Sequence, residues 1–270
     1  MKKVALFLFL SVCFAQQSCS SDSVGTEPEE NPQDILFKDD FNFFDEKVWT
    51  KETHEPGWTN QELQAYDAAH VSIGKDGDKS VLILTAERKG NKIYSGRINS
   101  KGKKSFKYRK IEASIKLPKT NGGLWPAFWM MPCNNDFGAN PWPKCGEIDI
   151  MEEVGVNPNY TSSSLHTEKF NHVKGNQITK ERLTTGAEDV FHVYRLEWTP
   201  DYIKTYVDGK ELLNFNNDGK NDVGSWPFNK PFYVILNLAW GGDWGGMKGV
   251  DESALPVQME VDYVRVFQKK

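Results

Sequence analysis

The sequence predicts a single all-β domain built as a sandwich or a barrel, and two observations carry this prediction. Apolar and polar residues alternate along most of the chain from Ile35 onward, which is the pattern of half-buried strands. No long stretch combines the 3.6-residue apolar period of a helix with helix caps. Many short strands within residues 35–270, with no internal linker or repeat, favour one sandwich or barrel domain.

The strands that the pattern predicts follow one another between short turn segments rich in Gly and Asn. Asp208-Gly209 separates two β-rich runs and predicts a hairpin. The clearest predicted strands are residues 81–86, 111–117, 202–213 (with that hairpin turn inside), 232–239 and 259–267.

Composition limits the classes of function. The 270 residues are 39% hydrophobic and carry a net charge of −4, which excludes a disordered or collagen-like chain. This charge implies no broad electropositive surface, so we expect no nucleic-acid partner. The nine Trp residues suit either a core or a sugar-binding groove.

The N-terminus has the pattern of an export signal. Two lysines precede the apolar run 4–15, which is too short to span a bilayer as a helix. Cys19 follows a small residue, as in a bacterial lipoprotein signal, although Gln16 stands where an aliphatic residue is usual. We expect a signal peptide at 1–18, a lipid on Cys19, a polar tether at 19–34 and an outer-membrane lipoprotein at the cell surface. The alternative is cleavage after Ala15, giving a periplasmic or secreted protein.

Two cysteines remain in the predicted domain. Cys133 and Cys145 bracket the segment NNDFGANPWPK, and disulfides persist in exported proteins. A disulfide between them would close this loop, and the alternative is two separate buried thiols. Neither the spacing nor the neighbours indicate a zinc site.

The densest chemical signal is the run GEIDIMEE at residues 146–153. Glu147 and Asp149 must point to the same side of a strand. A regular strand would next bring Glu153 to that side, whereas a β-bulge would bring Glu152 instead. The residues alone leave this choice open. They also leave open an exposed acidic strand or a calcium-binding edge.

This run resembles the signature of glycoside hydrolase family 16 in its bulged form, Glu-x-Asp-x-x-Glu. Five further blocks, in the same order, are similar to the endo-glucanase branch of the family, so the resemblance covers nearly the whole mature chain. These blocks are LWPAFWMMP, SSSLHT, FHVYRLEWTPDYIKTYVDG, PFYVILNLAWGGDWGG and VDYVRVF.

The resemblance implies a concanavalin A-like β-jelly-roll sandwich with a concave substrate cleft. It implies that Glu147 is the nucleophile, Glu152 the general acid/base and Asp149 a partner that hydrogen-bonds the nucleophile. A retaining glycosidase needs one ionised and one protonated carboxyl, so these roles agree with its chemistry. No cofactor is needed for this catalysis.

Aromatic residues are expected to line the cleft. Trp125 and Trp129, four residues apart in a strand, share a face, and indole rings stack well on pyranose rings. The resemblance favours the cleft for both over a place in the core, whereas Phe128 is expected in the core. Trp240, in the run AWGGDWGG, is expected as a wall of the cleft, because the glycines suggest a loop that comes close to the substrate. Trp244 is assigned no role.

Polar cleft residues follow from the resemblance. It places His166 near the substrate and Arg97 and Asn60 where they donate hydrogen bonds to sugar hydroxyls. The alternatives are a structural histidine, an arginine paired with the acidic cluster and an asparagine that caps a turn. Asp262 matches the position of a ligand to one structural calcium, and a plain surface acid is the alternative.

The expected substrate is a β-glucan polysaccharide. We expect endo-cleavage of mixed-linkage β-1,3/1,4-glucan with retention, and laminarin, a β-1,3-glucan, as a second substrate. The alternatives are a strict β-1,3-glucanase, a sulfated-galactan hydrolase and a non-catalytic glucan-binding jelly-roll lipoprotein. We expect a monomer that meets the membrane only through its lipid anchor.

Overall fold

The computed structural model describes residues 34–119, 122–133 and 142–268. All described residues belong to one compact unit. The predicted signal peptide, the lipid site at Cys19 and nearly all of the tether lie outside the described residues. No helix within the described ranges is long and apolar enough to cross a membrane.

The strands of the described residues form two sheets. The strands of the first are β1 (Ile35–Asp39), β3 (Gln64–Tyr66), β4 (Val71–Asp76), β5 (Lys79–Lys89), β6 (Lys92–Ser95), β8 (Lys110–Lys116), β13 (His192–Trp198), β14 (Tyr202–Val207), β15 (Lys210–Asn216) and β17 (Val257–Phe267). Those of the second are β2 (Thr50–Lys51), β7 (Arg97–Asn99), β9 (Leu124–Pro132), β10 (Glu147–Glu152), β11 (Tyr160–His166), β12 (Ile178–Leu183) and β16 (Phe232–Trp240).

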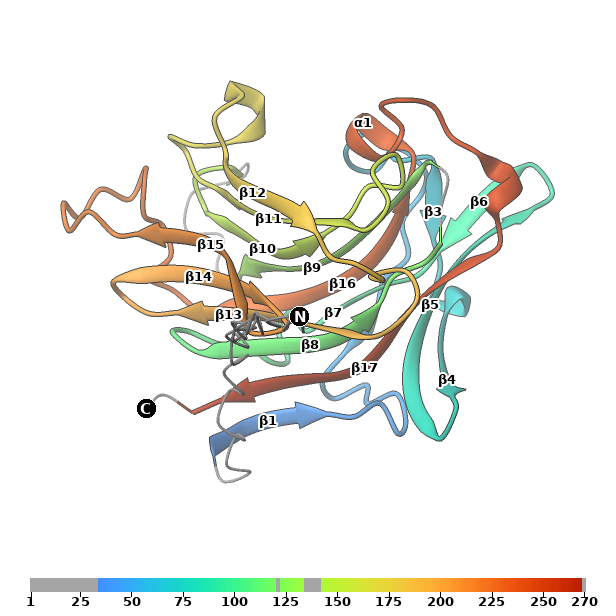
Figure 1. Cartoon of the computed structure of the whole chain (residues 1–270), viewed down its shortest axis with the longest axis horizontal. Helices are drawn as coiled ribbons and strands as arrows, with labels where there is room; N and C mark the ends of the chain where they lie inside the picture. Colours follow the sequence, from blue (N-terminus) through green and yellow to red (C-terminus); the bar gives the residue numbers. More distant parts are fainter. Residues whose placement is uncertain (1–33, 120–121, 134–141, 269–270) are drawn as a thin grey trace, which may run out of the picture. The chain divides into compact units, whose positions relative to one another are not determined.

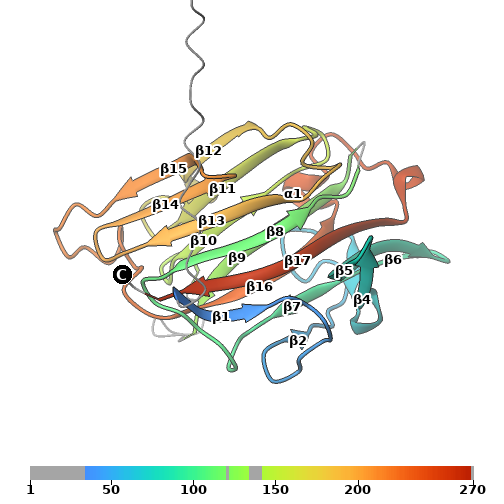
Figure 2. The ribbon, with the colours of Figure 1, turned by 60° about the horizontal axis from the view of Figure 1, so that its bottom comes forward.

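The order of the strands explains how distant segments meet. The first sheet runs β15-β14-β13-β8-β17-β5-β6-β3, with β1 beside β17 and β4 beside β5 (Figure 2). The second runs β12-β11-β10-β9-β16-β7-β2. Pairing is antiparallel except between β3 and β6. The helices among the described residues are one turn long: η2 (Ala68–His70), η3 (His172–Lys174), α1 (Gly242–Gly245) and η4 (Glu252–Ala254).

The hydrophobic core lies between the two sheets and follows from the alternation in the sequence. Ile111, Ala113 and Ile115 of β8 are fully buried, as are Phe128 and Met130 of β9. This confirms the predicted all-β sandwich and the core position of Phe128. The predicted hairpin is also confirmed, because Asp208 and Gly209 join β14 to β15 with φ of 47° and 74°, the positive values that tight hairpin turns require.

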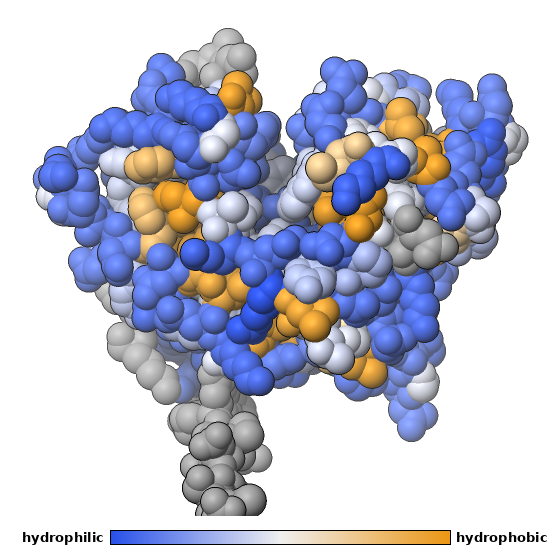
Figure 3. Space-filling view, turned by 45° about the horizontal axis from the view of Figure 1, so that its top comes forward, coloured by the Kyte–Doolittle hydropathy of each residue, from blue (hydrophilic) through white to orange (hydrophobic). Residues whose placement is uncertain are grey.

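The other face of the second sheet is curved and open. In Figure 1 this sheet lies on the upper side, while η3 and α1 rise above it on opposite sides. The space-filling view shows the same side of the molecule hollowed between two raised rims (Figure 3). Strand β16 crosses beneath this hollow with all nine residues buried, because one of its faces supports the core and the other supports the floor.

Candidate active site

A β-bulge in β10 sets the phase of the acidic side chains. Asp149 pairs with Trp129 of β9, but the next pair is Met151 with Phe128, so one residue of β10 is unmatched. The shift puts Met151 in the core and Glu152 on the same side as Glu147 and Asp149. The sequence left open whether this strand is regular or bulged, and the structure shows that β10 is bulged.

Glu153 lies on the opposite side of the strand. Its side chain is buried between the sheets, 1% exposed, beside Glu188 and near the phenol of Tyr194. Burial, together with the charge and hydrogen bond of Glu188, raises the pKa of Glu153 to about 9. The structure thus separates the two consecutive glutamates, with Glu152 in the cleft and Glu153 in the interior.

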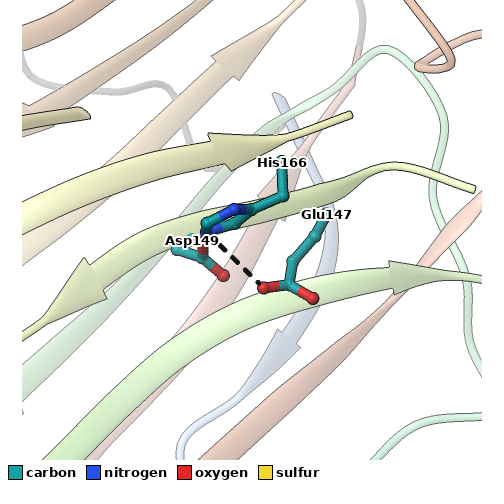
Figure 4. Close-up of side chains that lie close together, drawn as sticks. All are labelled: Glu147, Asp149 and His166. Atoms are coloured by element: carbon teal, nitrogen blue, oxygen red, sulfur yellow. Dashed lines mark ion pairs between the residues drawn. The ribbon is translucent and has the colours of Figure 1, made fainter. Parts of the chain in front are cut away.

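The acidic groups of the cleft are held by neighbouring side chains. His166 of β11 pairs with Glu147, and its Nε2 lies 3.9 Å from Glu147 Oε1 and 3.3 Å from Asp149 Oδ2 (Figure 4). Asp149 also shares a side-chain hydrogen bond with Glu147. Indole donors complete the arrangement, because Trp142 Nε1 donates to Glu147 Oε2 at 2.9 Å and Trp125 Nε1 donates to Glu152 Oε1 at 2.9 Å.

Burial raises the pKa of all three cleft carboxyls. It raises that of Glu147 to about 8, with a further contribution from the charge of Asp149, while His166 and the Trp142 hydrogen bond act in the opposite direction. Burial and the charge of Glu152 raise the pKa of Asp149 well above its ordinary value. Burial also raises the pKa of Glu152. Burial and mutual repulsion therefore oppose simultaneous ionisation of the three carboxyls and favour a proton held within the cluster, as general acid chemistry requires.

The sheet continues from the acids into an aromatic floor. Trp129 lies on the same face as Trp125, and its Nε1 donates to Asn237 Oδ1 of β16 at 2.7 Å. The Arg97 guanidinium of β7 lies 5.1 Å from the ring centroid of Trp129 and 5.2 Å from that of Trp58. Arg97 is buried and forms an ion pair with Glu52, so its charge is compensated.

Asn60 lies in a turn at the rim. It is exposed, has a φ of 48°, and its Nδ2 donates to Glu62 Oε1 at 3.2 Å. Its backbone carbonyl accepts from the Asp243 N–H at 2.8 Å, which ties this turn to α1. Glu62 is buried and also accepts from Tyr66 Oη at 3.1 Å, so an acid that the sequence did not single out orders this end of the cleft.

The prediction that Trp240 forms a cleft wall is wrong. Trp240 is 0% exposed and belongs to the core, where its ring packs over Gly123. The reason is strand parity, because Asn237 faces the cleft and a residue three positions later faces the core. Trp244 of α1 instead lies beside the cleft, with its ring 5.5 Å from that of Trp125.

The predicted disulfide is also wrong, because Cys133 and Cys145 are free thiols. Cys145 is buried, and its Sγ donates to the Gly146 carbonyl at 3.5 Å. Burial raises the pKa of this thiol to about 11, with a further contribution from the charge of Glu147. The burial that shelters Cys145 therefore stabilises the thiol over the reactive thiolate.

The surroundings of Asp262 do not fit a calcium site. Its Oδ2 accepts from Lys79 Nζ at 2.8 Å and from Ser114 Oγ at 3.5 Å, so an ammonium group already compensates its charge. Calcium requires six to eight oxygen ligands. Among the described residues, the sole group of three acidic or histidine side chains able to hold a metal ion is Glu147, Asp149 and His166.

Trp142 and Trp244 are the cleft residues that sequence reasoning missed. Trp142 lies five positions before Glu147, in a segment that the sequence interpretation treated only as a loop between cysteines. The nearness of an indole to the acidic strand was the available signal. For Trp244 the signal was its place in the Gly-rich run after β16, which lets the chain turn back over the sheet.

Comparison with known proteins identifies the family. Residues 55–265 match "Glycosyl hydrolases family 16". The chain belongs to this family. A β-glucanase of Rhodothermus marinus is 38% identical to this family 16 enzyme over 96% of the chain and 92% of its own length.

Solved structures of relatives have the same fold. The Rhodothermus marinus laminarinase aligns with a TM-score of 0.81 at 38% identity, covering 87% of this chain and 97% of its own. A family 16 endo-glucanase of Bacteroides ovatus, in complex with G4G3G-2F-DNP, aligns with a TM-score of 0.73 at 52% identity, covering 86% and 100%. These structures establish the jelly-roll sandwich of this chain, and enzymes of family 16 need no catalytic cofactor.

Proposed function

We propose that this enzyme is an endo-acting, retaining β-glucanase that cleaves mixed-linkage β-1,3/1,4-glucan and, as a second substrate, laminarin. The observation that carries the proposal is the bulge in β10, which sets Glu152 on the same face as Glu147 and Asp149. Endo-action is supported by the hollow between two raised rims in Figure 3, an open form that suits a polymer lying across it.

The proposed reaction has two steps. Glu147 reacts in its ionised form, which the Trp142 hydrogen bond and His166 favour against the effect of burial. The Glu147 carboxylate forms a bond to the anomeric carbon while the glycosidic bond breaks and the proton of Glu152 passes to the leaving oxygen. Glu152 then takes a proton from water, which attacks the same carbon and releases Glu147.

A neutral polysaccharide fits the proposed subsites. Trp125 and Trp129 supply indole rings suited to the apolar faces of sugars. Arg97, His166 and the exposed Asn60 are the proposed donors to sugar hydroxyls. Because the charge of Arg97 is compensated by Glu52, this part of the cleft favours hydroxyl groups over the sulfate of a sulfated galactan.

The linkage preference is supported by similarity. The Bacteroides ovatus family 16 protein of a mixed-linkage glucan locus, 52% identical to this chain, was solved with a G4G4G3G product. The similarity to the Rhodothermus marinus laminarinase supports the second candidate, a strict β-1,3-glucanase.

Product analysis distinguishes these candidates. We expect short oligosaccharides early in digests of barley β-glucan and lichenan, faster than from laminarin, and first products with the β-anomeric configuration by ¹H NMR. Activity on laminarin alone would establish the strict β-1,3-glucanase. Glu147→Gln should lose activity by about 10⁴-fold and still bind glucan in affinity electrophoresis. Equal sugar release by the wild type and this variant would overturn the assignment of Glu147.

Location is a separate proposal that follows from the N-terminal sequence. We propose a monomeric lipoprotein, held at the outer surface of the outer membrane by a lipid on Cys19. Labelled palmitate should enter the wild-type protein and be absent from Cys19→Ala, and added protease should remove the wild-type protein from intact cells. Labelling of both proteins would refute Cys19 as the acceptor, and protection from protease would favour a periplasmic location. Sedimentation of a chain beginning at Ser20 should give the monomer mass.

A further inference from the structure

One indole in the cleft contacts the proposed nucleophile directly. Trp142 Nε1 donates to Glu147 Oε2 at 2.9 Å, while the other carboxylate oxygen, Oε1, lies 3.9 Å from His166 Nε2. An indole N–H donates and never accepts or titrates, so it favours the ionised carboxylate at every pH at which the protein is folded. The geometry therefore provides a permanent donor for the group that must attack as an anion.

The ring of Trp142 is itself held by two histidines. His172 lies 5.0 Å away between ring centroids at an interplanar angle of 36°, and His166 lies 6.0 Å away at 45°. The two imidazoles contact each other edge to face at 5.2 Å. His172 therefore supports the indole from outside the catalytic strand, while His166 supports it from the neighbouring strand.

The segment that carries His172 is fixed by its own hydrogen bonds. Asn171, which is 1% exposed, caps η3 by accepting from Lys174 N at 3.2 Å, and it donates from Nδ2 to the Thr167 carbonyl at 3.0 Å. Asn176 Oδ1 in turn accepts from the backbone N–H of Asn171 at 3.1 Å. The position of His172 is thus set by hydrogen bonds within its own segment.

We propose that Trp142 is a positioning residue for Glu147, and that the ring of His172 holds the indole in its donating orientation. This inference rests on the proposed role of Glu147 as nucleophile. The indole bond restricts rotation of the carboxylate and disfavours its protonation, so its loss should slow the attack more than it weakens glucan binding. His172 acts through its ring, so another planar ring should replace it.

The first test is Trp142→Phe, which removes the N–H and keeps an apolar ring. We expect kcat to fall about ten-fold with KM changed less than about three-fold. Because the lost donor favoured the ionised form, the acid limb of kcat/KM should move upward by about one pH unit. His172→Ala should shift the limb in the same direction by less, and His172→Phe should restore the wild-type profile.

A matched control comes from the opposite part of the domain. Trp49 Nε1 donates to Asp39 Oδ2 at 2.7 Å, and Trp49 is a core residue that we assign to no site. Trp49→Phe removes the same kind of indole–carboxylate bond, so it should lower the melting temperature without moving the acid limb. An equal movement of the limb in both variants would overturn the proposal, because it would reflect general loosening.

A measurement on the wild-type protein covers the case in which Trp142→Phe does not fold. In ¹⁵N NMR spectra, the indole N–H signal of Trp142 should titrate with the same pKa as the acid limb, and this titration should vanish in Glu147→Gln. A signal that does not respond to pH overturns the positioning role. Full activity of Glu147→Gln would instead refute the nucleophile assignment, so the two failures are distinguishable.

Discussion

Trp125 and Glu152 lie on neighbouring strands and are joined by one hydrogen bond, from the indole Nε1 to the carboxylate Oε1 at 2.9 Å. The bond depends on the bulge, because without the extra residue in β10 the register would place Met151 on this side. One ring thus has two tasks in the proposed mechanism, since it donates to the acid and offers a surface to the sugar.

Removal of the Trp125 donor should change the alkaline side of the pH profile. The Trp125 hydrogen bond lowers the pKa of Glu152, so Trp125→Phe should raise it. Because Glu152 acts in its protonated form, activity falls as pH rises through its pKa, and the alkaline limb should move upward by about half a pH unit or more. Trp129→Phe is the control, because its indole donates to Asn237 and its loss should leave this limb in place. A limb that stays fixed in Trp125→Phe would contradict the role of Glu152 as acid.

Glu153 should make the fold less stable as pH rises. Its pKa in the folded protein is about 9, against an ordinary value of 4.5, so the folded state holds a proton that the unfolded chain releases. Stability contributed by this proton is present below about pH 4.5 and is lost progressively up to about pH 9.

Glu153→Gln tests this dependence by removing the proton while keeping the shape. At pH 8 the free energy of unfolding of the variant should exceed that of the wild type by about 1–3 kcal/mol. This difference should shrink toward pH 5. Denaturant titrations at the two pH values measure it. Parallel stability curves for the two proteins would show that Glu153 ionises in the folded state at its ordinary pKa.

Substitution of two tryptophans should separate the core from the cleft. Trp240→Ala removes a fully buried ring and should cost about 3–5 kcal/mol of unfolding free energy. Trp244→Ala removes a ring beside Trp125, so it should raise KM for glucan with a much smaller loss of stability. Calorimetry and kinetics on both variants check this, and a stable Trp240→Ala protein with raised KM would reinstate Trp240 in the cleft.

Because the two cysteines are free thiols, we expect reductant to leave the stability of the protein unchanged. A chain beginning at Ser20 should have the same melting temperature with and without dithiothreitol, because Cys133 and Cys145 are unpaired. Iodoacetamide added after denaturation, without reductant, should modify both cysteines as measured by mass spectrometry. Modification that requires prior reduction would establish a disulfide after all.

Strand parity explains which parts of the site followed from the sequence. Alternation correctly placed Trp125 and Trp129 on one face, because both lie within a single regular strand. The phase beyond Asp149 required tertiary information, since a bulge is specified by packing on both neighbouring strands. The resemblance suggested Glu152, and the residues alone left Glu153 equally open.

The errors arose where the period-two rule was not applied or where segments distant in sequence meet. Strand alternation places Trp240 on the face opposite to Asn237, which is the core face. The sequence interpretation instead followed the adjacent glycines and assigned Trp240 to the cleft. The rings of His172 and Trp142 are in contact although the two residues are distant in sequence, so no local pattern relates their positions. The cysteine spacing was compatible with a bridge, but spacing carries no information on the direction of the thiols.

The bulge in β10 also has a consequence for how this strand tolerates change in its length. Deletion of Ile150 would leave Glu-Ile-Asp-Met-Glu, in which ordinary alternation again brings the last glutamate to the side of the first. A bulged strand and a regular strand can therefore both bring the acids to one face. Gain or loss of a single codon at this point would alter the bend of the sheet and the spacing of its acids while preserving the set of reactive groups.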